Sequence, residues 1–118
     1  MNGFTAHTLP AEITVFAGSF ASQPLAFAHL ADAAPALDLD HVEVIGPEAR
    51  TPRLAGHFDP PTRDAILAAL RPGETCLLIL PAAFDGLVCP LGPTDLLRPL
   101  GPWRGTVTRL IPSRRQTP

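Results

Sequence analysis

The sequence predicts one small α+β domain, a mostly antiparallel sheet of four to six strands with two helices packed on it. The chain has 118 residues, of which 46% are hydrophobic and 17% charged, and this balance is typical of a single folded core. Strand-like segments gather towards the C-terminal end, and proline-rich stretches connect them. A compact α/β sandwich is the alternative, because the first three strands and two helices could form crossover units.

The first half of the chain predicts a strand, a helix and a second strand. The folded domain is expected over 11–111, after a flexible N-terminus at 1–10. Residues 12–18, EITVFAG, are rich in β-branched and aromatic side chains and indicate the first strand. A helix is expected to follow, with Ser22 as its N-cap, Pro24 in its first turn and Pro35 at its end. HVEVIG, 41–46, indicates the second strand.

The second half predicts a helix and two more strands. Residues 46–53 are rich in turn formers, although RLAGHF, 53–58, could supply a short strand. Asp59 followed by two prolines indicates the start of a helix, which Arg71, Pro72 and Gly73 end. ETCLLILP, 74–81, is apolar on both faces and is typical of a central strand.

Glycine and proline dominate the segment that follows this central strand. We expect turns there, with at most a short strand or helical turn near 94–98. Residues 105–111, GTVTRLI, indicate the last strand, and a basic tail is expected over 112–118.

Charge is distributed unevenly along the chain. Residues 1–97 contain all eleven Asp and Glu and only four Arg, whereas residues 98–118 contain five Arg and no Asp or Glu. An acidic body with a basic end suits a charged protein partner. The absence of Lys, with abundant Ala and Pro, is typical of a GC-rich bacterial genome, so the arginines are no sign of nucleic-acid binding.

The chain is expected to be cytoplasmic and to have no membrane-bound part. MNGFTAHTLP does not resemble a signal peptide, and the apolar run CLLILPAAF is too short to cross a bilayer. Two cysteines are too few for a disulfide scaffold.

Two stretches resemble the start of the nucleotidylyltransferase nucleotide site. They are GHFDPPTR, 56–63, and FAGSF, 16–20. The resemblance implies a nearby His-x-Gly-His or Thr-x-Gly-His motif, whose histidines stabilise the transferred group, and neither stretch is followed by one. We therefore interpret both stretches as starts of helices.

No motif predicts a catalytic residue, a metal or a cofactor. Cys76 and Cys89 are separated by twelve intervening residues and have no close ligand pairs, and Walker, Rossmann and G-x-S-x-G patterns are missing. One ligand site remains as an alternative hypothesis. The backbone N–H groups of Gly18, Ser19 and Ser22 precede a helix and could hold a phosphate or carboxylate, as in a small enzyme or ligand-binding domain.

A protein-binding surface is the favoured hypothesis for a site. Its acidic part is Asp38, Asp40, Glu43 and Glu48, four acids in eleven residues. Trp103 and Arg104 are also candidates, because Trp and Arg are frequent at interface hot spots. A solvated strand edge and a Trp that closes the core are the structural alternatives.

Short phrases along the chain carry a further resemblance. Phe16, Ala17 and Gly18 end the first expected strand, and Leu97 to Trp103 follow a Leu-x-x-x-Gly-x-aromatic pattern near the end. These phrases are similar to those of the immunity protein 22 family of bacterial polymorphic-toxin systems. The resemblance implies a non-enzymatic protein that neutralises a cognate toxin, expected to be a basic domain, by occluding its active site. The oligomeric state is left open.

Overall fold

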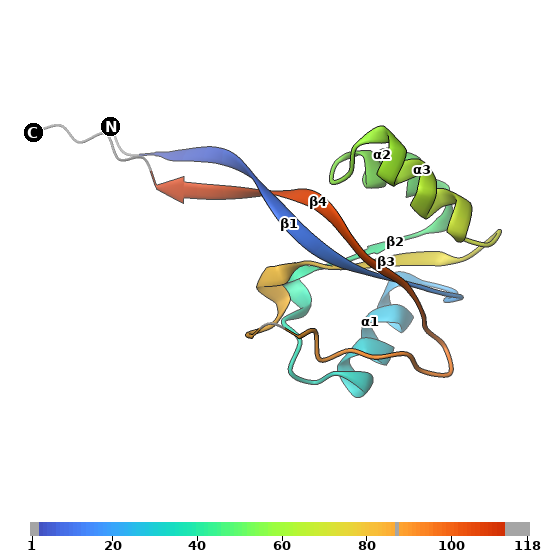
Figure 1. Cartoon of the computed structure of the whole chain (residues 1–118). Helices are drawn as coiled ribbons and strands as arrows, with labels where there is room; N and C mark the ends of the chain where they lie inside the picture. Colours follow the sequence, from blue (N-terminus) through green and yellow to red (C-terminus); the bar gives the residue numbers. More distant parts are fainter. Residues whose placement is uncertain (1–2, 87, 113–118) are drawn as a thin grey trace, which may run out of the picture.

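The computed structural model describes residues 3–86 and 88–112 and confirms the α+β fold. Its four strands form one sheet in the order β2-β3-β1-β4, and every neighbouring pair is antiparallel (Figure 1). The strands are β1 Phe4–Gly18, β2 Val42–Ile45, β3 Thr75–Ile79 and β4 Arg98–Pro112.

The two long strands, β1 and β4, pair along nearly their whole length and continue past the ends of β2 and β3 (Figure 1). We call their projecting parts, Phe4–Leu9 and Val107–Pro112, the arm. The flexible N-terminus expected at 1–10 is therefore corrected, because strand β1 already begins at Phe4. Its sequence signal is weak, since Thr, His and Pro interrupt the apolar pattern. The tail at 113–118 lies outside the described residues.

Strand β4 begins at Arg98, earlier than the expected 105. Pro99 and Pro102 argued against a strand there. Strand β4 lies at the edge of the sheet, where a missing N–H costs no ladder bond if it points outwards.

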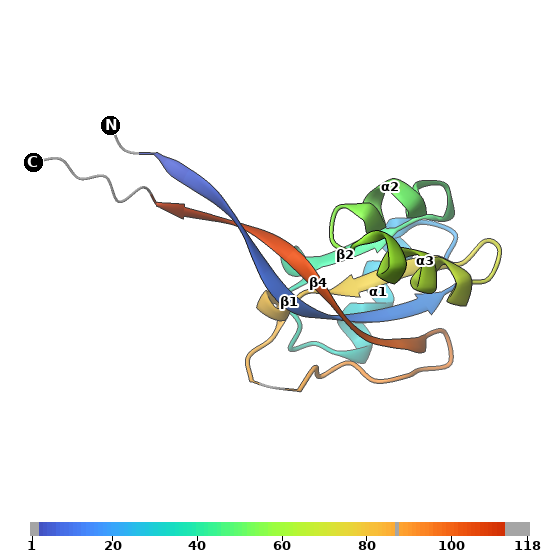
Figure 2. The same ribbon diagram turned by 45° about the horizontal axis from the view of Figure 1, so that its top comes forward.

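Helices cover both faces of the sheet (Figure 2). Helix α1, Gln23–Ala33, lies on one face, and helices α2, Arg50–Ala55, and α3, Pro60–Ala69, lie on the other. The short strand expected within 53–58 is wrong, because Arg50–Ala55 is helical after the 3-10 turn η2 at Pro47–Ala49. The sheet thus carries three helices rather than two.

Capping follows the sequence closely at α3. The side chain of Asp59 accepts the N–H of Thr62 at 3.0 Å, so Asp59 is the N-cap. Gly73 has a φ of +80° in the turn before β3, a conformation that favours glycine. Ser22 is the N-cap of α1, although its side chain makes no capping bond.

Two apolar clusters lie on opposite faces of the sheet. On the α1 side, Leu30 packs with Phe16 and Leu77, and on the other side Leu54 and Ile66 pack against the sheet. Every residue of β3 is buried, as predicted for the central strand. In the described part of the chain no helix is long and apolar enough to cross a membrane.

Candidate functional site

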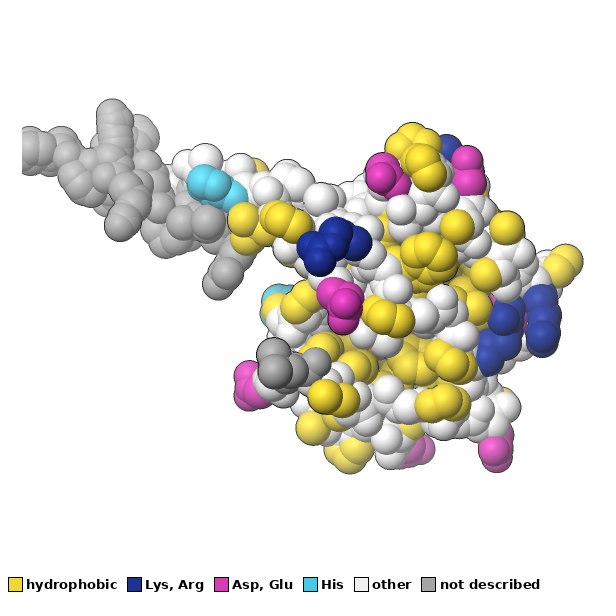
Figure 3. Space-filling model, in the orientation of Figure 1, with side chains coloured by type: hydrophobic (Ala, Val, Ile, Leu, Met, Phe, Trp, Pro, Cys, Tyr) yellow, Lys and Arg dark blue, Asp and Glu magenta, His cyan; other side chains and the backbone are white. Residues whose placement is uncertain are grey.

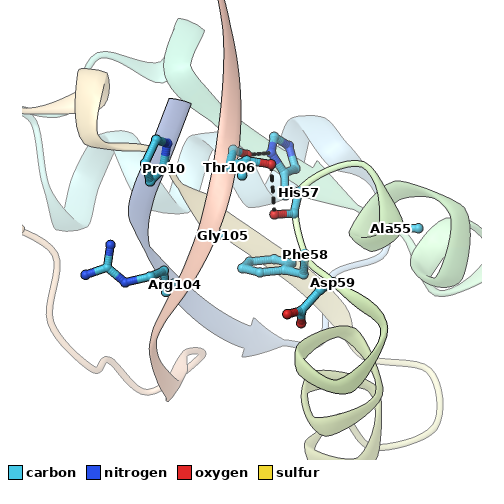
Figure 4. A pocket seen from close by; sticks show the side chains of 8 residues that line it. All are labelled: Pro10, Ala55, His57, Phe58, Asp59, Arg104, Gly105 and Thr106. Carbon is cyan, nitrogen blue, oxygen red and sulfur yellow. Dashed lines mark hydrogen bonds between the residues drawn. The ribbon is translucent and has the colours of Figure 1, made fainter. Parts of the chain in front are cut away.

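A single histidine in the loop between α2 and α3 connects both edge strands of the sheet. His57 places Nδ1 2.8 Å from the carbonyl oxygen of Thr106 in β4, and Thr106 returns its N–H to the His57 carbonyl at 2.8 Å. Figure 4 shows His57 and Thr106 facing each other beside Phe58 and Gly105, with the Nδ1 contact and a 3.4 Å bond from the Thr106 hydroxyl to the His57 carbonyl as dashed lines. On its other side, Nε2 of His57 lies 3.1 Å from Oε1 of Glu43 in β2.

The partners of His57 fix its protonation. A backbone carbonyl and a carboxylate can only accept hydrogen bonds, so both contacts are satisfied together when both ring nitrogens carry a proton. The hydrogen bond with Glu43 raises the pKa of His57 against the opposing effect of burial. The same bond, followed by the charges of His57 and Arg53, lowers the pKa of Glu43 although burial opposes it. The two hydrogen bonds and these pKa shifts therefore favour the charged forms of both His57 and Glu43.

This ion pair does not have the geometry of a catalytic dyad. A general base needs a ring nitrogen directed at a substrate, and both nitrogens of His57 are engaged within the fold. The cavity beside it, of about 420 Å³, is lined by Pro10, Asp59 and Arg104 among others. A Cβ at Gly105 would lie 2.6 Å from the His57 carbonyl oxygen, so glycine lets the loop approach β4.

A second ion pair joins the start of β3 to the start of β4. Glu74, 6% exposed, accepts from Arg98 at both oxygens, with Nη2–Oε1 at 2.5 Å and Nε–Oε2 at 3.0 Å. The N–H of Arg71 adds a third bond, to Oε1 at 2.7 Å. The Arg98 bond lowers the pKa of Glu74 and raises that of Arg98. Arg50 binds the Glu74 carbonyl, so these charges hold the turn after α3.

The glycine loop expected to hold an anion adjoins this ion pair. Gly18 and Ser19 line a cleft of about 270 Å³ together with Arg71, Glu74 and residues 94–98. Ser22 is not among the lining residues. A Cβ at Gly18 would lie 2.3 Å from the Leu96 carbonyl oxygen, so this glycine permits close packing of the long loop. The carboxylate of Glu74 in the same cleft opposes an anionic ligand.

A histidine–hydroxyl pair lies next to this cleft. Nε2 of His29 in α1 is 2.7 Å from Oγ1 of Thr94, and the ring of Phe20 packs against His29. Oγ1 also accepts the N–H of Leu96 at 3.2 Å, within a turn where Thr94 and Leu97 bond each other through their backbones. The pair closes that turn and attaches it to α1.

The four acids of the expected partner surface have different surroundings. Asp38 lies just before the 3-10 turn η1, Leu39–His41, and Asp40 lies within it; both are exposed. Oδ1 of Asp38 accepts the N–H of Asp40 at 3.0 Å. Glu48 is exposed at the other end of β2. Glu43 lies between them and is held by His57. The structure therefore separates Glu43 from the three outward-facing acids.

Trp103 and Arg104 are neighbours in β4 with different roles. Trp103 is half-buried against the cluster under α2 and α3, and its Nε1 donates to the Leu100 carbonyl at 2.9 Å. Arg104 is exposed beside the cavity at His57.

Sequence reasoning missed His57, Arg53, Glu74 and Arg98. None of the motifs considered gives these side chains an ion-pair role, and the partner of each is at least ten positions away in the chain. Pairing of this kind is visible only after the sheet brings distant segments together.

The cysteines do not suggest a metal centre. Burial raises the pKa of the Cys76 thiol to about 12, as suits an inert core residue. Within 3–86 and 88–112 no three His, Cys, Asp or Glu side chains lie close enough together to hold a metal ion.

Fold and site together define a small α+β domain in which the ion pairs His57–Glu43 and Arg98–Glu74 hold edge strands and turns in place. Comparison with protein families, with curated proteins and with solved structures gives no match.

Proposed function

We propose that this chain is a non-enzymatic binding protein that neutralises a cognate toxin by occluding its active site. The toxin surface would be basic and the acidic residues of this chain would face it. The resemblance to the immunity protein 22 family supports this proposal. A cytoplasmic location in a bacterium would accompany it.

One observation carries the proposal: the ionisable groups divide into two sets. Glu43 and Glu74 are paired within the fold, with His57 and Arg98. Asp38, Asp40 and Glu48 are exposed, and within the described ranges none of the three has an Arg within ion-pair distance. Asp38 accepts the N–H of Asp40 and lies 3.9 Å from Nε2 of His41, but these contacts are at the surface, so the second set can still face a basic partner.

The described residues as a whole favour a basic partner. They include eleven Asp and Glu against seven Arg. Exposed carboxylates steer a basic protein to the surface and speed its association, an effect that added salt screens. Blocking an active site in this way needs a rigid, complementary surface and no chemistry of its own.

The direct experiment co-expresses this chain with the product of each neighbouring gene. We expect one of those products to arrest growth alone, to lose that effect with this chain, and to co-purify with it. The triple variant Asp38→Asn, Asp40→Asn and Glu48→Gln should weaken protection. If no neighbouring product binds this chain or is inhibited by it, the proposal fails.

A small enzyme or ligand-binding domain that uses Gly18, Ser19 and Ser22 remains the second hypothesis. Arg71 and Arg98 in the same cleft favour an anion, whereas Glu74 opposes one. Thermal shift against nucleotides and sugar phosphates tests it, with Ser19→Ala as the variant because Gly18 also packs against Leu96. A flat response across the panel would remove this hypothesis.

A further inference from the structure

Two thirds of strand β1 has a neighbouring strand on one side only. Strand β3 pairs with β1 from Thr14 to Gly18, whereas β4 pairs with it from Phe4 onwards. Between Phe4 and Ile13, no backbone bond joins β1 to any described residue outside β4. This part of β1 is therefore a free strand edge.

The direction of each backbone group on the arm follows from one contact. Thr106 turns both its N–H and its carbonyl to His57, and so away from β1. In an antiparallel ladder, the backbone N–H and C=O of successive residues point alternately towards the partner strand and away from it. When one residue's groups point away from the partner strand, those of the residue directly opposite also point away, on the other side of the pair. Thr108 therefore points outwards on β4, and its partner Thr8 points outwards on β1. Pro10, opposite Thr106, lacks the N–H that would point the same way.

The edges of the main sheet are guarded. On β4, the loop at His57 covers Thr106, and Pro102 lacks an N–H. On the opposite edge, β2 is four residues long. Short strands, prolines and covering loops are the usual protection against further pairing. Along its free edge, Phe4–Ile13, strand β1 has only Pro10 as protection of this kind.

A groove opens beside this free edge. It has a volume of about 840 Å³ and lies between Leu9–Glu12 of β1 and Leu80–Ala82, with Phe84 and Val107 adding apolar surface. Figure 3 shows hydrophobic side chains at the base of the arm and over the body beneath it, with both acidic and basic side chains near the base of the arm. An incoming strand would lie beyond the end of β3 and enter this groove.

We infer that a second copy of this chain occupies the groove, its β1 pairing antiparallel with the free edge of β1 about a two-fold axis. In that arrangement the same strand edge faces itself, so the free backbone N–H and C=O groups of each copy bond those of the other. The two arms then form a four-stranded sheet, in place of two-stranded ribbons that are marginally stable in water. The tip of each arm reaches the groove of the other copy.

Charge favours the same occupant. The arm contains no Asp or Glu, whereas Glu12 lines the groove and Asp85 lies between two residues that line it. An acid-free arm therefore meets a groove whose lining residues include Glu12 and His41 and no Arg. The β4 side of the arm leads to His57 and Arg104 and offers a smaller cavity, of about 420 Å³.

Two proline variants at directly opposite positions test the inference. Thr8→Pro removes the outward N–H of β1, and Thr108→Pro removes the corresponding N–H of β4. By light scattering after size exclusion, the unmodified chain should have twice the monomer mass at high concentration and dissociate on dilution. Thr8→Pro should remain a monomer, and Thr108→Pro should dimerise as the unmodified chain does.

Amide hydrogen exchange of the unmodified chain keeps the test decisive if a proline variant folds poorly. The N–H of Thr8 should be protected at high concentration and lose that protection on dilution, while the N–H of Thr108 exchanges fast at both. The inference is overturned if the unmodified chain is a monomer throughout, if Thr108→Pro alone prevents association, or if the Thr8 amide exchanges fast in a dimer. These outcomes are independent of whether a toxin is found.

Discussion

His57 and Thr106 exchange two hydrogen bonds of 2.8 Å each, one through the His57 side chain and one through its backbone. The loop between α2 and α3 thereby satisfies both backbone groups of Thr106 at the outer edge of β4. Glu43 holds the other side of the ring, so one residue connects β2, β4 and the helical layer.

The stability of the fold should depend on pH through this pair. The raised pKa of His57 adds stability that is fully present below its ordinary value of 6.5 and is lost as pH rises through the folded pKa. The lowered pKa of Glu43 adds stability present above 4.5 and lost as pH falls through its folded pKa. The pair should therefore stabilise most between these values.

Urea unfolding of His57→Gln across this pH range checks that expectation. The variant should be less stable by about 2 kcal/mol in the window, because a charged hydrogen bond is lost beside a partly buried carboxylate. The difference in free energy of unfolding between the variant and the unmodified chain should shrink at pH values above and below this window. His41→Gln, at a half-exposed position, is the matched control. An equal loss at every pH would contradict the assigned imidazolium.

Glu74→Gln should destabilise the fold by about 2–4 kcal/mol, because it leaves Arg98 without a carboxylate in a partly buried place. The double variant Glu74→Gln with Arg98→Met should recover part of that loss. Asp95→Asn, on the exposed surface nearby, should change little. Thermal unfolding of the unmodified chain, Glu74→Gln, Arg98→Met and the double variant provides the cycle, and additive effects would contradict a direct pair.

Gly18→Ala should cost about 1–3 kcal/mol, because its Cβ would meet the Leu96 carbonyl oxygen in a backbone with little room to move. Gly92→Ala is the matched control, since no atom lies within 4 Å of the Cβ position there. Chemical denaturation measures both. Equal stability of the two variants would show that the loop yields to the added methyl group.

The exposed acids should be separable from Glu43. Asp38→Asn, Asp40→Asn and Glu48→Gln together should leave the free energy of unfolding within about 1 kcal/mol, because exposed charges contribute little and Asn can still cap. Glu43→Gln should lower it, since His57 loses its carboxylate. Denaturation of both variants checks this contrast. A large loss in the triple variant would assign those acids to the fold.

The predictable parts of the fold are those with a local physical cause. Asp59 before two prolines predicts the start of α3, and the uniformly apolar run at Thr75–Ile79 predicts a buried strand. Neither depends on a distant partner. The helix at Arg50–Ala55 was not predictable in this way, because Gly and Pro around it also suit turns.

The remaining parts depend on contacts between distant segments. Phe4–Pro10 has little strand signal of its own and becomes a strand through β4. The same holds for the ion pairs, since nothing near Glu43 in the sequence announces His57.

The pairing of β1 with β4 also has a kinetic consequence. It joins the first described strand to the last, so the most extensive ladder of the sheet consists of contacts between residues far apart in sequence. Loop closure over such a span costs entropy before any contact is gained, and high contact order slows folding. On the ribosome, Phe4–Ile13 of β1 would have no strand partner on either side until β4 emerges. Completion of this sheet is therefore a late event in synthesis, and the nascent chain is most exposed to aggregation just before it.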